Sequence, residues 1–199
     1  EVDRLNDLIA HLTDHARPLP RLHPGEAHRK EAAPFRTTPY VCIAPASVWF
    51  TKQWPAEKWS ALVRALPTDV RVLYIGSPGD VPLCEGIRLA AGRGEVLAGR
   101  LSLLGTAALM GGAGMNFVND SAPLHMASAM HAPVVAVFCS TVPAFGFGPL
   151  HANGRVVQID RPLECRPCGL HGHRSCPKGH FRCASAIDPA QLAAFVRDR

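Results

Sequence analysis

Long apolar runs are missing from this sequence. None reaches the roughly 20 residues that a membrane-spanning helix needs. Residues 1–4 also lack the basic stretch, followed by an apolar one, that is typical of a signal peptide. Both absences favour a cytoplasmic protein.

Charge is scarce and scattered. Lys and Arg number 21 against 16 Asp and Glu, and the 199 residues contain no long basic block. A net charge of +5 suits acidic partners such as nucleotide phosphates, anionic lipid head groups or nucleic acid. Because the cations are spread along the chain, a solvated surface explains most of them. With 47% hydrophobic residues, the composition is that of one folded domain with a substantial core.

From residue 40 onward, short β-rich runs alternate with helical patterns. This alternation is typical of βαβ units and predicts an α/β fold, a Rossmann-like parallel sheet with helices on both faces. The predicted strands cover residues 40–44, 70–75, 95–97, 115–118, 133–138 and 155–159. The predicted helices cover residues 56–66 after Pro55, 82–91, a segment from a Ser102 cap to Gly111, 122–130 and 189–198.

These patterns divide the chain into four parts. Residues 1–39 combine a helix, with Leu5, Leu8, Ile9 and Leu12 at helical spacing, and a proline-rich connector. Residues 40–160 form the Rossmann-like domain. A Cys-rich loop follows at 161–187, and a C-terminal helix at 188–199.

Ligands of open α/β sheets bind beyond the carboxyl ends of the strands. After the first predicted strand come Ser47 and Lys52, and then Pro55, which opens a helix. The N–H groups and dipole of a helix N-terminus favour an anion, and Lys52 adds a full positive charge. This strand-to-helix connection, called a corner below, is therefore predicted to bind a phosphate. The alternative is that Lys52 is a surface lysine in a loop.

A second corner follows the strand that ends at residue 118. Asp120 or Ser121 is a natural N-cap, and the small residues Ser121 and Ala122 allow a ligand to approach the backbone. His125 lies four residues after Ser121, on the same side of the first helical turn. This corner suits pyrophosphate or sugar hydroxyls. The alternative is that Asp120 and Ser121 only cap the helix and His125 is a partly buried polar residue.

A third corner, the turn at residues 76–79, begins at Gly76 after the second predicted strand. A nucleoside could be contacted there, although Gly and Pro mark any turn.

The seven cysteines fall into two sets. Three stand singly in or beside apolar segments, where a free cysteine behaves as a small hydrophobe. The other four lie close together, at Cys165, Cys168, Cys176 and Cys183. Four thiolates suit a structural zinc or iron, and His171, His173 or His180 could replace one ligand. Reduced structural thiols and disulfides are the alternatives.

Several motifs resemble the lipopolysaccharide heptosyltransferases, glycosyltransferase family 9. They are APAS at 44–47, KQWP at 52–55 and NDSAPLHMA at 119–127, each at a predicted strand-to-helix corner. The segment at 138–143 and the Cys-rich run at 165–180 also resemble the family. The resemblance covers residue 40 to the C-terminus.

The resemblance implies a GT-B glycosyltransferase whose C-terminal Rossmann-like domain binds ADP-heptose. The N-terminal domain would bind the lipopolysaccharide core acceptor and carry the catalytic base. Residues 40–160 would then be the nucleotide-sugar-binding domain, and without an acceptor domain the chain should bind donor but transfer little. The implied reaction is an inverting transfer that needs no cofactor, in the cytoplasm or at the inner-membrane surface.

Carried over onto this sequence, the resemblance makes Lys52 and Asp120 catalytic. The donor would be bound by these two residues and by six more: Ser47, Val48, Gly76, Ser121, Ala122 and His125. The family usually has glycine where this chain has Ala122, so an added methyl group stands where a phosphate would approach.

Three other functions compete with this interpretation. The closest is a glycosyltransferase that uses another nucleotide sugar, because phosphate contacts do not distinguish the base or the sugar. A nucleic-acid-binding module would use the basic Cys/His-rich segment, but only Phe181 there could stack on a base, so no nucleic-acid partner is expected. An NAD-dependent oxidoreductase lacks support, because no Gly-x-Gly-x-x-Gly follows the first predicted strand.

Overall fold

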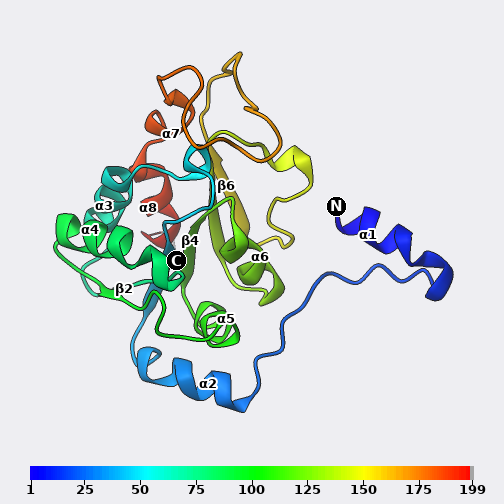
Figure 1. Ribbon diagram of the computed structural model, residues 1–199. Helices are drawn as coiled ribbons and strands as arrows, with labels where there is room; N and C mark the ends of the chain where they lie inside the picture. Colours follow the sequence, from blue (N-terminus) through cyan, green and yellow to red (C-terminus); the bar gives the residue numbers. More distant parts are fainter. Residues whose placement is uncertain (198–199) are drawn as a thin grey trace.

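The computed structural model describes residues 1–197, and its centre is a sheet of six parallel strands in the order β3-β2-β1-β4-β5-β6 (Figure 1). This confirms the predicted Rossmann-like α/β fold. The strands are β1 (Tyr40–Ala44), β2 (Arg71–Tyr74), β3 (Glu95–Val96), β4 (Met115–Asn119), β5 (Val134–Phe138) and β6 (Gly154–Gln158).

Helices cover both faces of the sheet. One face packs against α3 (Ala56–Ala65), α4 (Val81–Ala91) and α8 (Pro189–Arg197). The other packs against α5 (Leu103–Gly111) and α6 (Ala122–Ala129). The remaining helices are α1 (Val2–Leu8), α2 (Glu26–Ala32) and α7 (Arg182–Ser185). Short 3-10 turns are η1 (Ala10–Leu12), η2 (Ala33–Phe35), η3 (Phe50–Lys52), η4 (Pro78–Asp80) and η5 (Pro143–Phe145).

The predicted strands and the five predicted sheet-flanking helices match these elements to within one residue at each end. Ser102 caps α5 as expected, since its Oγ accepts a hydrogen bond from the Gly105 N–H at 3.0 Å. Asp198, the predicted last residue of the final helix, lies outside the described residues.

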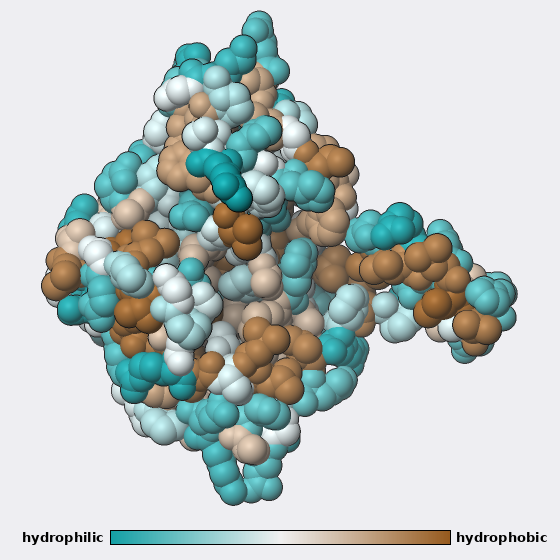
Figure 2. Space-filling view, in the orientation of Figure 1, coloured by the Kyte–Doolittle hydropathy of each residue, from teal (hydrophilic) through white to brown (hydrophobic). Residues whose placement is uncertain are grey.

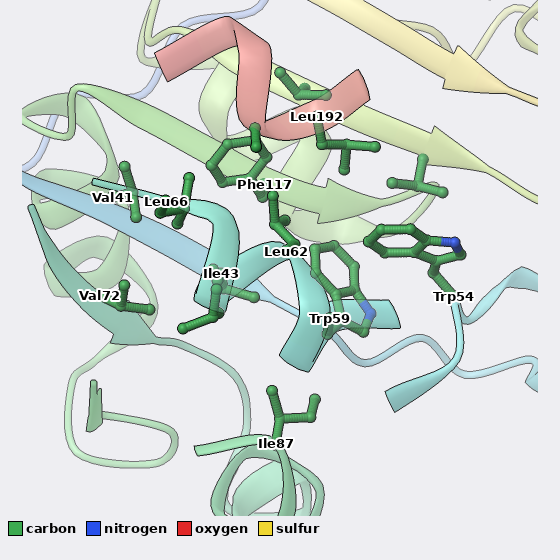
Figure 3. Close-up of a cluster of buried hydrophobic side chains, with 14 of the residues drawn as sticks. Val41, Ile43, Trp54, Trp59, Leu62, Leu66, Val72, Ile87, Phe117 and Leu192 are labelled. Atoms are coloured by element: carbon green, nitrogen blue, oxygen red, sulfur yellow. The ribbon is translucent and has the colours of Figure 1, made fainter. Parts of the chain in front are cut away.

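The central strands are buried on both faces, which is why they read as continuous apolar runs. On the face covered by α3, Ile43 and Phe117 of the sheet meet Trp59 and Leu62 of the helix (Figure 3). The ring of Trp54 lies edge-on to that of Trp59, with centroids 5.0 Å apart. This cluster fixes the segment between β1 and α3, from which Lys52 reaches the carboxyl ends of the strands.

Helix α2 lies inside the proline-rich connector and was not predicted from the sequence. Its Ala32 is buried in the core cluster that contains Leu109 of α5. The Glu31 carboxylate also accepts hydrogen bonds from the N–H and Oγ of Ser102, at 3.1 and 2.7 Å. Contacts with a distant helix stabilise α2, so local composition could not reveal it.

The predicted N-terminal helix is present as α1, followed by η1. This arm projects from the body (Figure 1), and apolar side chains lie on its surface (Figure 2). Leu8 and Leu12 are 61% and 75% exposed. Among residues 1–197, no helix combines the length and apolar character needed to cross a membrane.

Leu62→Ala should destabilise the protein by about 2–5 kcal/mol, because it leaves a cavity under α3 in the buried cluster. Urea denaturation followed by circular dichroism measures the loss. Leu89→Ala in α4 is the matched control, since Leu89 is 68% exposed and should cost less than about 0.5 kcal/mol. Equal losses in the two variants would contradict this description of the core.

Candidate functional site

A cavity of about 300 Å³ opens beyond the carboxyl ends of β4 and β5. It is lined by Lys52, Asp120, Ser121, Ala122, His125, Val142, Phe145, Phe147, Leu170 and His171. The first five of these were singled out in the sequence, and the structure brings them together. The strand order places the cavity next to the switch between β1 and β4, where open α/β sheets bind their ligands.

A nearly buried ion pair joins the two predicted corners. The Nζ of Lys52 lies 2.7 Å from Oδ2 of Asp120, and the side chains are 16% and 6% exposed. The same Oδ2 accepts a hydrogen bond from Oγ1 of Thr141 at 2.6 Å. Since an ammonium group has three N–H donors, Lys52 can bind a ligand in the cavity while it stays paired with Asp120.

Asn119, the last residue of β4, holds the two corners together. Its Oδ1 accepts a hydrogen bond from the Trp54 N–H at 3.0 Å, and its Nδ2 donates to the carbonyl oxygen of Pro45 at 2.7 Å. Asn119 is fully buried. This role was not predicted from the sequence, although a polar residue at the end of an apolar strand indicates a buried hydrogen-bonding group.

The N-terminus of α6 forms one wall of the cavity. Ser121 occupies the predicted N-cap position, but its Oγ lies 3.4 Å from the Asn119 carbonyl oxygen and makes no capping bond within the described chain. The Asp120 carboxylate does not cap the helix either, because it is engaged by Lys52 and Thr141. Ala122 stands at the first helical position, where an N–H group has no intrahelical partner. The free N–H groups of this first turn favour the binding of an anion in the cavity.

His125 stands at the exposed rim of the cavity, with its ring edge-on to Phe147 and the centroids 6.2 Å apart. Although much of the residue is exposed, protein atoms around the ring lower the pKa of His125 from its ordinary value by desolvating the charged form. The Asp120 carboxylate acts in the opposite direction, and the Lys52 ammonium lowers the pKa further. A neutral imidazole at neutral pH can both donate and accept hydrogen bonds with sugar hydroxyls.

Three predicted donor contacts do not line this cavity. The Ser47 carbonyl oxygen accepts a hydrogen bond from Nε2 of Gln53, and Val48 is 91% exposed. Gly76 follows β2, where an added Cβ would lie 2.8 Å from the Asp80 carboxylate. All three residues follow the carboxyl ends of strands, as the cavity does: Ser47 and Val48 follow β1, and Gly76 follows β2, which neighbours β1 on the side away from β4.

The cavity also contains residues that were not predicted from the sequence to line it. They are Val142, Phe145 and Phe147 after β5, Leu170 from the Cys-rich loop, and His171, which was expected only as a possible metal ligand. For the residues after β5, one indication of a role came from the sequence: the segment at 138–143 resembles the family. Nothing in the local sequence of the Cys-rich loop places Leu170 over the cavity.

The four clustered cysteines surround a second, much smaller cavity of about 10 Å³. It is lined by Cys165, Cys168, Cys176 and Cys183, with Thr51, Ser140, Arg166, Pro177, Lys178, His180 and Phe181. All four thiols are free, and Sγ of Cys165 lies 3.8 Å from Nε2 of His180. Burial raises the pKa of the Cys183 thiol to about 11. The donor chemistry therefore fits a soft metal, although in the described part of the chain no three side chains stand close enough to bind one.

The sheet order, the cavity at the strand ends and the cation beside a helix N-terminus define the class: an α/β domain of the kind that binds phosphorylated ligands. Residues 1–175 match the family model described as glycosyltransferase family 9 (heptosyltransferase). The chain belongs to this family of glycosyltransferases.

One curated relative is lipopolysaccharide heptosyltransferase 1 of Pseudomonas aeruginosa, 29% identical over 172 residues, which are 84% of this chain and 46% of the relative. Among solved structures, the ADP-heptose lipopolysaccharide heptosyltransferase II of E. coli aligns with a TM-score of 0.74 at 20% identity. The alignment covers 95% of this chain and 56% of that one. This chain thus spans about half the length of the relatives that it matches.

The dodecameric, iron-containing heptosyltransferase TibC from E. coli, solved in complex with ADP-D-beta-D-heptose, also shares the fold. Its TM-score is 0.59 at 19% identity, covering 81% of this chain and 45% of that one. These neighbours confirm that the fold is that of a Rossmann-like domain of GT-B heptosyltransferases.

The pKa of His125 should lie below its ordinary value of about 6.5 and should rise in Lys52→Met. The substitution removes a nearby positive charge and leaves the Asp120 carboxylate unpaired, and both changes favour imidazolium. Asp120→Asn should lower the pKa. NMR titration of the His125 ring proton measures all three values, and a pKa unchanged by either substitution would contradict the site.

Proposed function

We propose that this chain is the donor-binding part of a glycosyltransferase that transfers heptose from ADP-heptose to a lipopolysaccharide core acceptor. The observation that carries the proposal is the Lys52–Asp120 pair beside the N-terminus of α6, in a cavity large enough for a diphosphate and part of a sugar. The names of the relatives, which include ADP-heptose and lipopolysaccharide, support this donor and this acceptor class.

The donor would lie along the edge of the sheet. Its diphosphate would contact Lys52 and the backbone at Ser121 and Ala122, and its sugar would face His125. The nucleoside would extend towards Ser47, Val48 and Gly76, on the side of β2. This orientation follows from the strand order, because the end of β1 lies between the ends of β2 and β4.

In the proposed reaction, an acceptor hydroxyl attacks the anomeric carbon from the face opposite the diphosphate. The bond from that carbon to the phosphate oxygen breaks, ADP leaves with the bonding electrons, and the configuration inverts. The hydroxyl proton passes to a base that an acceptor-binding domain would supply. The residues of this cavity would stabilise the negative charge that develops on the leaving phosphate.

Lys52 would neutralise that charge directly, together with the N–H groups of the first turn of α6. Such prearranged donors typically stabilise a transition state by about 3–4 kcal/mol each. Asp120 and Thr141 would hold the ammonium in place, so that little reorganisation accompanies bond breaking. No step of this scheme requires a metal ion. We propose that the reaction takes place in the cytoplasm, at the surface of the inner membrane where a lipid-linked acceptor is anchored.

Lys52→Ala should weaken ADP binding about 10- to 100-fold, because it removes the cation and leaves the Asp120 carboxylate facing the diphosphate. Asp120→Ala should weaken binding less, since Lys52 remains but loses its anchor. Isothermal titration calorimetry of this chain with ADP measures both. Lys30→Ala is the control, because Lys30 is 75% exposed and pairs with Glu26 on its own helix.

Affinities of the Lys52 and Asp120 variants equal to that of the parent would refute the proposed site. Competition between ADP-heptose and UDP-sugars in the same assay identifies the donor. Tighter binding of a UDP-sugar would mean that the donor is another nucleotide sugar. The assignment as a glycosyltransferase would not change.

We also propose that the cysteine cluster holds a structural zinc or iron ion, through Cys165, Cys168, Cys176 and Cys183. Four thiols around one cavity are the donor set that such an ion prefers. Because no three of them stand close enough in the described residues, binding would draw them together, and the ion would then stabilise a loop with few apolar residues. Elemental analysis of protein purified without added metal should find about one ion per chain, and the quadruple Cys→Ser variant should contain none. A metal content near zero under reducing conditions would leave the thiols as reduced structural groups.

A further inference from the structure

The Cys-rich loop (residues 161–187) is fastened to the ends of two strands by one guanidinium group. The Nε of Arg166 donates to the carbonyl oxygen of Cys139 at 2.7 Å, and Nη2 donates to that of Thr141, also at 2.7 Å. Nη2 also lies 3.3 Å from the Phe138 carbonyl oxygen and 2.7 Å from Oε1 of Gln158. Arg166 therefore holds the segment that follows β5, which carries Thr141.

A second attachment holds the neighbour of Lys52. Thr51 is 1% exposed, and its Oγ1 accepts hydrogen bonds from the His173 N–H at 2.7 Å and from Oγ of Ser140 at 3.1 Å. Its N–H donates to the His173 carbonyl oxygen at 3.1 Å, and its own carbonyl oxygen accepts from the Ser140 N–H at 3.2 Å. One buried hydroxyl therefore connects three segments: residues 50–52, the end of β5 and the Cys-rich loop.

The loop backbone also packs directly on the lysine. Gly172 has φ +84°, a conformation that favours glycine. A Cβ there would lie 3.0 Å from Oγ1 of Thr51 and 3.1 Å from Cγ of Lys52. In Figure 1 the orange loop accordingly lies beside the cyan segment that follows β1, above the ends of the strands.

Both members of the ion pair are thus flanked by residues that the Cys-rich loop holds. Thr51 precedes Lys52, and Thr141, whose carbonyl oxygen binds Arg166, donates its hydroxyl hydrogen bond to Asp120. On this side, the segment from β1 to α3 is held by Ser140 and by the Cys-rich loop, whereas Val48 and Phe50 are 91% and 47% exposed. A lysine has a long flexible stem, so its position depends on such restraints.

We infer that the Cys-rich loop sets the geometry of the phosphate site, with Arg166 and Thr51 as positioning residues that fix Lys52 against Asp120. The inference rests on the proposed function, because it assigns the loop to the same diphosphate site. Neither residue lines the larger cavity, so neither needs to touch the donor. Their effect on binding passes through the ion pair.

The test compares ADP affinities, measured by calorimetry, of variants that keep the fold. Thr51→Val removes the buried hydroxyl with little change of shape and should weaken ADP binding about 5- to 10-fold. Thr51→Ser keeps the hydroxyl and should bind ADP within about twofold of the parent. Arg166→Gln should weaken binding about tenfold, whereas Arg174→Gln, at an exposed position of the same loop, should leave it unchanged.

A double-mutant cycle separates positioning from a general loss of structure. In a Lys52→Ala background, Thr51→Val and Arg166→Gln should change ADP affinity by less than about twofold, because the group that they position is gone. Full additivity of the effects would overturn the inference. Far-UV circular dichroism checks that each variant folds, and if Arg166→Gln does not, the Thr51→Val and Thr51→Ser pair decides.

The outcomes distinguish this inference from the proposed function. If the parent chain binds no ADP, both fail. If the parent binds ADP and Lys52→Ala weakens binding, but Thr51→Val and Arg166→Gln bind like the parent, the phosphate site stands and only the role of the loop is overturned.

Discussion

The structure of the site depends on an ion pair that is almost removed from water. Taking an ammonium and a carboxylate out of solvent costs several kcal/mol per ion, and a buried pair often stabilises a fold no better than apolar side chains do. Lys52 and Asp120 are 16% and 6% exposed, so stability alone does not account for them. The proposed function accounts for them, because a prearranged cation at the carboxyl ends of the strands would meet a phosphate without reorganisation.

Other features of the fold keep this pair assembled. The β1–β4 adjacency brings the two corners together, and the Asn119 amide links them through Trp54 and Pro45. Thr141 provides a second hydrogen bond to the Asp120 carboxylate, which reduces the cost of burying that charge. The Cys-rich loop then closes over the same region, with the Gly172 backbone against the lysine stem. Segments from four parts of the chain thus meet at one charge pair.

Much of this architecture was predictable because its signals are local. The six strands read as short apolar runs, and the helices between them carried caps such as Ser102 and Pro55, so their ends were found to within one residue. The two corners at Lys52 and Asp120 followed from the same logic, since each is a strand end next to a helix start. Helix α2 escaped detection because contacts with α5 stabilise it, and α7 because it is one short turn within a Cys-rich stretch.

By itself the sequence determined the fold class, the order of its elements and the two corners at Lys52 and Asp120, because hydrophobic periodicity and helix caps act over a few residues. Only the tertiary structure decided that the Asp120 carboxylate pairs with Lys52 instead of capping α6, and that Thr141, Leu170 and His171 join the site. These are contacts between residues distant in the chain. They depend on how the strands are ordered and how the loops pack, which no local pattern encodes.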